Sequence, residues 1–284
     1  PAPPAILPTM PLPDTLLAAA LRTTQRVLLK PAFHPRWPVP WQRRWLHLLA
    51  RIGHLPKGIT RRDVVVGGVR AERWADERAT PVRAGVVLYL HGGGYTVGSP
   101  RTHRTIAAWL ARDSGLPVVV IDYRLAPEHP FPAALEDAVA AFDALALEGP
   151  VVVAGDSAGG GLALALAITL RDRDRDRDRG GAGDLAAAAD ADADGAQPAA
   201  LVLLAPLVDL RESSPLPAVP GEAMLSERWA RANARAYAAG RADDGDLRQG
   251  LRAVAGAGDQ RWHPPHLVGA HHLAEALRPL RRQS

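Results

Sequence analysis

The sequence has no cysteine in its 284 residues, which excludes a disulfide framework and any metal site built on thiolates. This absence also favours a reducing compartment, so we expect a cytoplasmic protein. No apolar run reaches the roughly 18 residues that a membrane-spanning helix requires. No basic stretch precedes an apolar one near the first residue, so we expect neither a membrane span nor a signal peptide.

Lysine is nearly absent as well. The basic residues number 34, and all but Lys30 and Lys57 are arginines. The arginines are spread along the chain between aspartates, and no basic run is interleaved with aromatic residues. The net charge of +4 is therefore dispersed, and we expect no nucleic-acid partner.

Aromatic residues make up only 5% of the chain, yet Trp37, Trp41 and Trp45 lie close together. Apolar residues at helical spacing predict helices over Thr15–Leu29 and Trp41–Ile52, so we assign residues 1–55 to an N-terminal helical cap. The tryptophans fit two arrangements. One is a helical subdomain packed on the core, and the other is a lid whose rings line an apolar pocket.

Beyond residue 55 the pattern changes to short apolar strands that alternate with helices. The segment from Asp63 to Trp74 predicts a hairpin with its turn at Gly67-Gly68. The alternation downstream predicts an α/β fold whose mostly parallel sheet has helices on both faces. The other predicted elements are strands at Val86–Leu90, Pro117–Ile121, Val151–Ala154 and Leu201–Leu204, and helices at Arg101–Arg112, Pro132–Ala146 and Glu227–Gly240.

Residues 171–179 alternate arginine with aspartate, and glycine, alanine and aspartate dominate up to residue 197. Such a segment has few apolar side chains to bury. We expect a solvated extension of the preceding helix, followed by a low-complexity loop without a role in function.

The most informative motif is Gly155-Asp156-Ser157-Ala158-Gly159, which lies between a predicted strand and a predicted helix. A serine hydroxyl becomes a nucleophile only when it is held in place and a base takes its proton. Glycines two positions before and after Ser157 let the strand and the helix approach without a Cβ clash. We therefore expect Ser157 at the apex of a tight, strained turn.

A second glycine-rich segment, His91-Gly92-Gly93-Gly94, directly follows the predicted strand at Val86–Leu90. Acyl transfer builds negative charge on a carbonyl oxygen, and fixed backbone N–H groups stabilise that charge. A phosphate cradle is the alternative for such a loop. However, the sequence lacks the Gly-Lys-Ser/Thr and Gly-x-Gly-x-x-Gly patterns of phosphate sites, so we expect no cofactor.

These motifs resemble those of the hormone-sensitive-lipase-type carboxylesterases of the α/β-hydrolase fold. The resemblance covers about residues 60–240, and more loosely the N-terminal segment. It is carried by His91–Ser99, by Asp122–Pro132, by Gly155–Gly160 and by Leu203–Leu210.

The resemblance implies hydrolysis of carboxylic esters through an acyl-enzyme on Ser157. It assigns the oxyanion hole to Gly92, Gly93 and the N–H of Ala158, and it makes His91, His129 and Asp209 structural. It also divides residues 56–284 into the hydrolase core and a second cap segment at about 211–240.

In this fold the acid and the histidine of the catalytic triad follow the serine. Leu251–Ala257 predicts a strand that ends near Asp259, which is our candidate for the acid. Only 25 residues follow Asp259, fewer than the family's remaining helix, strand and histidine need. The later histidines are His263, His266, His271 and His272, and none lies in the expected motif.

We therefore expect a C-terminal region that has diverged, or that is truncated or frame-shifted, and whose last strand is missing. An exposed sheet edge would then favour self-association. Besides contact of the moderately amphipathic N-terminal segment with a lipid surface, two hypotheses follow. The first is a serine carboxylesterase that acts on a small ester, with activity impaired by loss of the histidine. The second is a non-catalytic protein of the same fold that binds a small apolar ligand.

Overall fold

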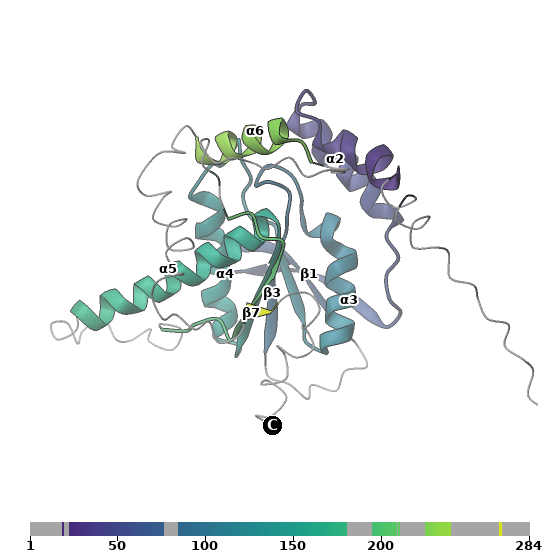
Figure 1. The fold of residues 1–284 in the computed structure, drawn as a ribbon. Helices are drawn as coiled ribbons and strands as arrows, with labels where there is room; N and C mark the ends of the chain where they lie inside the picture. The colour runs from purple at the N-terminus through teal and green to yellow at the C-terminus, as the bar shows by residue number, and fades with distance from the viewer. Residues whose placement is uncertain are drawn as a thin grey trace, which may run out of the picture.

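A computed structural model describes residues 19, 23–76, 85–180, 195–208, 210, 225–239 and 267–268 (Figure 1). They form a seven-stranded sheet with the strand order β1-β2-β4-β3-β5-β6-β7. The predicted α/β class with a mostly parallel sheet is confirmed. The strands are β1 (Ile59–Val66), β2 (Val69–Asp76), β3 (Val86–Leu90), β4 (Val118–Ile121), β5 (Val151–Asp156), β6 (Ala200–Leu204) and β7 (Leu267–Val268).

The predicted hairpin is present at one edge of the sheet. β1 and β2 pair antiparallel from Ile59↔Asp76 to Val66↔Val69, and β2 pairs antiparallel with β4. Gly67 and Gly68 form the turn with φ of 56° and 78°. These positive angles favour glycine, and they explain why the turn falls at this pair.

The strands from β4 to β7 are all parallel, in the spatial order β4-β3-β5-β6-β7. Their carboxyl ends therefore meet at one edge of the sheet, which we call the carboxyl edge. The short strand β7, which pairs with β6, was not predicted, whereas the predicted strand at Leu251–Ala257 lies outside the described residues.

Helices cover both faces of the sheet, as predicted. Along β4, Val118 and Val120 pack with α3 (Arg104–Ser114), whereas Val119 and Ile121 pack with α4 (Ala133–Ala146) and α5 (Ala158–Gly180). Because successive strand residues point to opposite faces, an unbroken apolar strand such as β4 supplies both cores at once.

The alternating Arg-Asp run continues α5 as far as Gly180, in agreement with the predicted helical extension. Arg173 makes two contacts with the carboxylate of Asp143 on α4, at 2.9 and 3.0 Å. The run is thus partly packed against the neighbouring helix. Residues 181–194 lie outside the described residues.

The remaining helices lie across the carboxyl edge, at the top of Figure 1. They are η1 (Gln25–Leu29), η2 (Lys30–Phe33), α2 (Val39–Leu49), η3 (Ala50–Ile52) and α6 (Glu227–Ala238), and a short η4 (Pro100–His103) precedes α3. We call α2 and α6 the cap helices. Within the described part of the chain, no helix is long and apolar enough to cross a membrane.

Candidate active site

Ser157 lies at the carboxyl edge, between the end of β5 and the start of α5. Its φ of 50° lies in the left-handed region, which a serine adopts only when its surroundings hold it there. The predicted strained turn is confirmed. The backbone N–H of Ser157 donates to Leu204 O at 2.9 Å, and its carbonyl accepts from Leu207 N at 2.8 Å and from Gly161 N at 3.1 Å.

The glycines of the motif are required because the neighbouring backbone leaves no room for a Cβ atom. A Cβ on Gly155 would lie 2.4 Å from Gly159 O, and a Cβ on Gly159 would lie 2.0 Å from Leu90 O. A Cβ on Gly161 would lie 2.2 Å from Leu207 O. Strand, turn and helix therefore approach each other as closely as backbones can, which is the close approach that the spacing of the glycines predicts.

Residues 91–97, which we call the glycine loop, leave the end of β3 beside this turn. In the parallel pairing of β3 with β5, Leu90 is the partner of Gly155. Adjacent strands lie about 4.8 Å apart, so the glycine loop and Ser157 start from neighbouring positions. Gly93 and Gly94 have φ of 125° and 60°, conformations that fold the loop back over the strand end.

His91 is the first residue of the glycine loop, and it is buried. Its ring is fully buried and stacks on Tyr123 with a centroid distance of 4.2 Å, while Tyr123 donates its hydroxyl to the carbonyl of His91 at 2.6 Å. Burial, followed by the charge of His103, lowers the pKa of His91 to about 3, so the imidazole is neutral at physiological pH. These contacts fit the structural role that the resemblance implied for His91.

Asp156, the residue before the serine, ties the glycine loop to the sheet. One carboxylate oxygen accepts from Tyr89 Oη at 2.9 Å and from Gly92 N at 3.0 Å, and it lies 3.4 Å from Nε2 of His103. Burial raises the pKa of Asp156, but the hydrogen bond and charge of His103 and the Tyr89 hydroxyl outweigh it, so the pKa lies below its ordinary value. Asp156 therefore carries a negative charge.

This contact involves one of the predicted oxyanion donors. The N–H of Gly92 is already donated to Asp156, so it is not available to a substrate in this structure. No hydrogen bond joins the N–H groups of Gly93, Gly94 or Ala158 to another described residue. The sequence does not show this difference, because the partner of Gly92 lies 64 positions away.

The cap helices contact the glycine loop from the side opposite the sheet. Arg43 on α2 donates to the carbonyls of Thr96 and Ala126, at 2.8 and 2.9 Å, and pairs with Glu128. On α6, Asn233 accepts a hydrogen bond from the hydroxyl of Thr96, and the ring of Tyr237 stacks on that of Tyr95 with centroids 3.8 Å apart. No sequence motif pointed to Arg43 or Asn233.

Within the described part of the chain, no titratable side chain bonds the nucleophile. Ser157 is partly exposed, and among the described residues no side chain forms a hydrogen bond with its Oγ. The predicted acid Asp259 lies outside the described residues, as do His263, His266, His271 and His272 and also Asp209. His129 is described, and its side chain is exposed.

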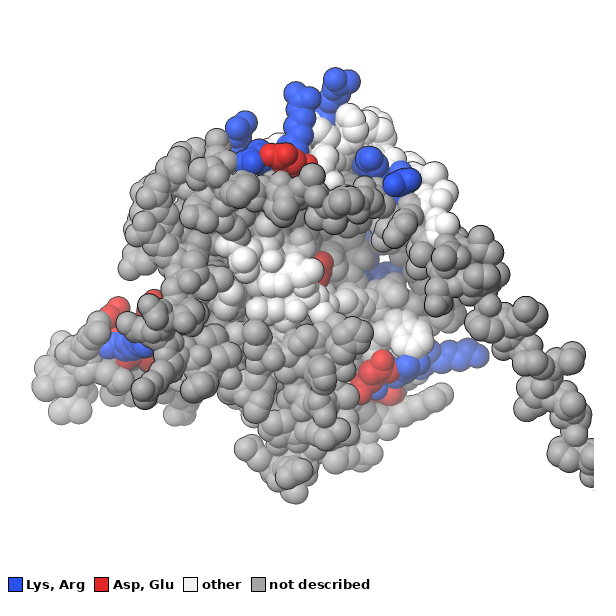
Figure 2. Space-filling model, viewed as in Figure 1, with Lys and Arg blue, Asp and Glu red and all other residues white. Residues whose placement is uncertain are grey.

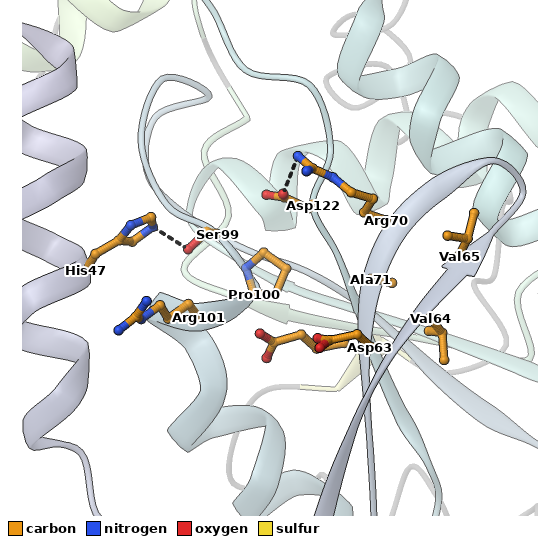
Figure 3. Close-up of a pocket in the computed structure, with 11 residues that line it drawn as sticks. His47, Asp63, Val64, Val65, Arg70, Ala71, Ser99, Pro100, Arg101 and Asp122 are labelled. Atoms are coloured by element: carbon orange, nitrogen blue, oxygen red, sulfur yellow. Dashed lines mark hydrogen bonds and ion pairs between the residues drawn. The ribbon is translucent and has the colours of Figure 1, made fainter.

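A cavity of about 530 Å³ opens between α2, η4 and the β1–β2 hairpin (Figure 3). Its polar groups include Arg70, which pairs with Asp122, and His47, whose ring bonds Ser99. Burial, followed by the charge of Arg101, lowers the pKa of His47. Ser157 does not line this cavity, so we do not place the reaction there. The described residues hold no cluster of ligands suited to a metal ion.

Comparisons with known proteins agree with this geometry. Residues 87–272 match the family model described as the alpha/beta hydrolase fold. An acetyl-hydrolase of Streptomyces hygroscopicus is 44% identical over 110 residues, which are 37% of this chain and 36% of that protein. An ethyl acetate hydrolase of Pseudomonas putida is 47% identical over 92 residues, or 29% of each chain. The chain thus spans about a third of the curated relatives that it matches.

Solved structures match over nearly the whole chain. An esterase from the bacterial hormone-sensitive lipase family superimposes with a TM-score of 0.67 at 26% identity, over 96% of this chain and 97% of that one. A hormone-sensitive lipase from a metagenome library gives a TM-score of 0.69 at 27% identity, over 95% of this chain and 85% of that one.

Proposed function

Because this chain belongs to the alpha/beta hydrolase fold family, we propose that it hydrolyses carboxylic esters through an acyl-enzyme on Ser157. The observation that carries the proposal is the left-handed turn at Ser157 directly beside the glycine loop. The turn exposes the hydroxyl at the carboxyl edge, where ligands bind in open α/β sheets. The names of the relatives, acetyl-hydrolase and ethyl acetate hydrolase, favour a short acyl group.

In the first step, Ser157 Oγ attacks the ester carbonyl carbon and loses its proton to a base. The bond from that carbon to the alcohol oxygen then breaks, and the alcohol leaves with a proton. Water next attacks the acyl-serine, which releases the acid and restores the hydroxyl. Each attack places a negative charge on the carbonyl oxygen, and this charge must be stabilised.

We assign that stabilisation to the N–H groups of Gly93, Gly94 and Ala158. Gly94 replaces Gly92 in this set because the N–H of Gly92 is bonded to Asp156. Ala158 is the first residue of α5, so its N–H has no acceptor within the helix, and the positive end of the helix dipole adds to the effect. Removal of one such donor typically lowers kcat by about 100-fold to 1,000-fold.

The base and the acid of the triad stay predictions. The order of residues in the fold leaves Asp259 as the candidate for the acid, and His263, His266, His271 and His272 as candidates for the base. The assignment of residues 1–55 and 211–240 to a cap around the site, and the cytoplasmic location, also stay predictions.

The direct test is hydrolysis of p-nitrophenyl acetate by the full chain. We expect Ser157→Ala to lower kcat by at least about 1,000-fold, since a triad that loses its nucleophile keeps only residual activity. Thr60→Ala is the matched control, because it removes a hydroxyl that bonds Ala75 O at the other end of the sheet. Equal rates for the wild type and Ser157→Ala would reject the proposal.

A second function rests on one observation in the sequence, namely that no histidine after Ser157 lies in the motif expected for the base. In that case the protein binds a small apolar ligand and does not hydrolyse it. A fluorophosphonate probe separates the two functions, because rapid labelling of Ser157 requires an activating base. Rapid labelling of the wild type that is lost in one His→Ala variant would identify the base. Absence of labelling would favour the binding protein.

A further inference from the structure

The helix α2 packs with its polar face toward the core. Gln42 is buried and bonds Trp229, Arg43 reaches the glycine loop, and His47 bonds Ser99. Trp41, Leu48 and Ile52 lie on the opposite side, seven and four residues apart, and are 58%, 51% and 74% exposed. The Trp41 ring therefore lines no apolar pocket among the described residues, whereas α2 itself contacts the core through its polar side.

These side chains are part of a larger apolar surface. Of nine large apolar side chains that are exposed in the described residues, six lie between residues 27 and 52. Trp45 joins the two helical segments, since its ring N–H donates to Leu28 O at 2.8 Å and its ring packs edge-on against Trp37. We call this set the outer cap surface: Val27, Leu28, Trp37, Trp41, Leu48 and Ile52.

The charge around the outer cap surface has one sign. Between Asp14 and Asp63 the sequence has ten lysines and arginines and no aspartate or glutamate. Seven of these basic residues are exposed and form no ion pair with any described residue; besides Lys57 and Arg62, five lie between residues 26 and 51, close to the outer cap surface. These five are Arg26, Lys30, Arg36, Arg44 and Arg51. The Arg44 guanidinium lies 5.7 Å from the centre of the Trp41 ring, so charge and apolar surface are in direct contact.

The second cap helix extends the positive charge. α6 buries Trp229, Asn233 and Tyr237, whereas Arg228 and Arg235 point away from the core and, with Arg231 and Pro35, line a cavity of about 450 Å³. The ring of Trp229 packs edge-on against Phe33, so the two cap segments are in contact. Figure 2 shows basic side chains along the end of the molecule that α2 and α6 form.

We propose that the outer cap surface docks onto the face of an anionic lipid bilayer. Tryptophan, leucine and isoleucine would enter the boundary between head groups and acyl chains, while the surrounding arginines contact lipid phosphates. The charge argues against a second copy of the chain as the occupant, because a symmetric dimer would bring two basic surfaces together. The exposed apolar centre argues against nucleic acid, whose backbone offers phosphates but no apolar layer.

Vesicle flotation tests this proposal without reference to the chemistry at Ser157. We expect binding to phosphatidylcholine vesicles that contain about 30% phosphatidylglycerol, at least tenfold tighter than to phosphatidylcholine alone. Binding should fall steeply in about 1 M salt, where the Debye length is only ~3 Å. Equal binding to both kinds of vesicle, or no binding to either, would overturn the proposal.

Two double variants, each with a matched control, locate the surface. Trp41→Ser with Ile52→Ser should weaken binding about tenfold or more, whereas Val65→Ser with Leu147→Ser, equally exposed on the core, should not. Arg44→Gln with Arg51→Gln should also weaken it about tenfold, whereas Arg62→Gln with Arg101→Gln should not.

All four replacement sets lie at exposed positions, and circular dichroism checks that each variant folds. Equal loss in a variant and its control would reject the outer cap surface as the docking site. Sedimentation of the wild type and of each variant tests whether a second copy of the chain, and not a bilayer, covers the outer cap surface. If Trp41→Ser with Ile52→Ser turns a dimer into a monomer and leaves vesicle binding unchanged, a second copy covers this surface and the proposal fails.

Discussion

The glycine loop is held from two sides, and the two sides differ in kind. On the sheet side, Gly92 is fixed by Asp156, whose side chain is 29% exposed, and His91 is fixed by the buried Tyr123; both partners belong to the strands and their ends. On the cap side, Thr96 is held by Arg43 and Asn233, which come from two helices far away in the sequence. Arg43 keeps 24% of its side chain exposed and its partner Glu128 keeps 49%.

This difference indicates which contacts set the shape of the loop and which contacts couple it to the cap. Buried polar bonds in a tightly packed region are costly to break, whereas half-exposed ion pairs contribute little by themselves. We therefore expect changes on the sheet side to have larger effects than changes on the cap side, and changes on the outer side of the cap to have the smallest effects.

The largest effect is expected for Gly159→Ala. The added Cβ would lie 2.0 Å from Leu90 O and 2.6 Å from His91 O, so strand β3 or helix α5 must move. We expect a loss of about 3 kcal/mol or more in the free energy of unfolding, measured by urea denaturation.

Gly115→Ala is the control for backbone conformation alone. Gly115 has φ of 68° at the end of α3, and no other group lies within 4 Å of the position that an added Cβ would take. We expect a loss of only about 1 kcal/mol there. Equal losses in the two variants would show that close packing does not set the shape of the turn.

The next largest effect is expected for Asp156→Asn, which keeps the shape of the side chain but removes its charge. The carboxylate holds Gly92 and His103, so we expect kcat for p-nitrophenyl acetate to fall about 100-fold, with a smaller change in KM. Asp63→Asn is the control, because that side chain is 75% exposed. An unchanged kcat would contradict the role of Asp156 in positioning the loop.

Asp156 also predicts a dependence of stability on pH. Its pKa in the folded chain lies below the ordinary value, so its contribution is present above an ordinary carboxyl pKa of about 4 and is lost as the pH falls through the lower, folded value. Asp156→Asn should therefore lose less stability than the wild type between pH 6 and pH ~3. Urea denaturation at several pH values measures this difference, and parallel losses would count against it.

On the cap side, Arg43→Gln should cost about 2 kcal/mol, because two buried carbonyls lose a charged donor. Glu128→Gln should cost less than about 1 kcal/mol, since the ion pair is half exposed. Arg62→Gln, at an exposed arginine on β1, is the control. If Glu128→Gln costs as much as Arg43→Gln, the ion pair and not the carbonyl contacts holds the cap.

The smallest effect is expected on the outer side of the cap. Trp41→Ser should change the free energy of unfolding in solution by no more than about 0.5 kcal/mol, because the ring is 58% exposed. Trp229→Ser, which removes the buried tryptophan of α6, is the comparison and should cost several times more. A large loss in Trp41→Ser would show that its ring is covered in solution.

The sequence predicted the sheet side of this comparison well. Short-range patterns predict the turn at Ser157, its glycines, the hairpin and the parallel strands. The reason is that backbone conformation and strand burial are encoded in residues close together in the sequence. For the proposed oxyanion donors, the sequence alone does not distinguish one glycine from another. Gly92 and Gly93 look alike in sequence, and only the carboxylate of Asp156 distinguishes their N–H groups.

The cap side was predicted poorly, for a physical reason. Apolar residues at helical spacing indicate that a helix has an apolar face, but not what that face contacts. Here Arg43 and Gln42 attach α2 to the core through polar bonds, which leaves the apolar face outside. The bond from Arg43 to Ala126 spans 83 positions, and no local pattern encodes such a contact.

The length of α5 separates the chemistry from the most repetitive part of the chain. Ala158 begins the helix at the nucleophile and Gly180 ends it, so its 23 residues place the two ends about 35 Å apart. Figure 1 shows the far end projecting away from the carboxyl edge. Gain or loss of Arg-Asp pairs there can alter the length of the protein without moving Ser157, which makes this end a suitable place to graft a tag, a reporter or a second domain.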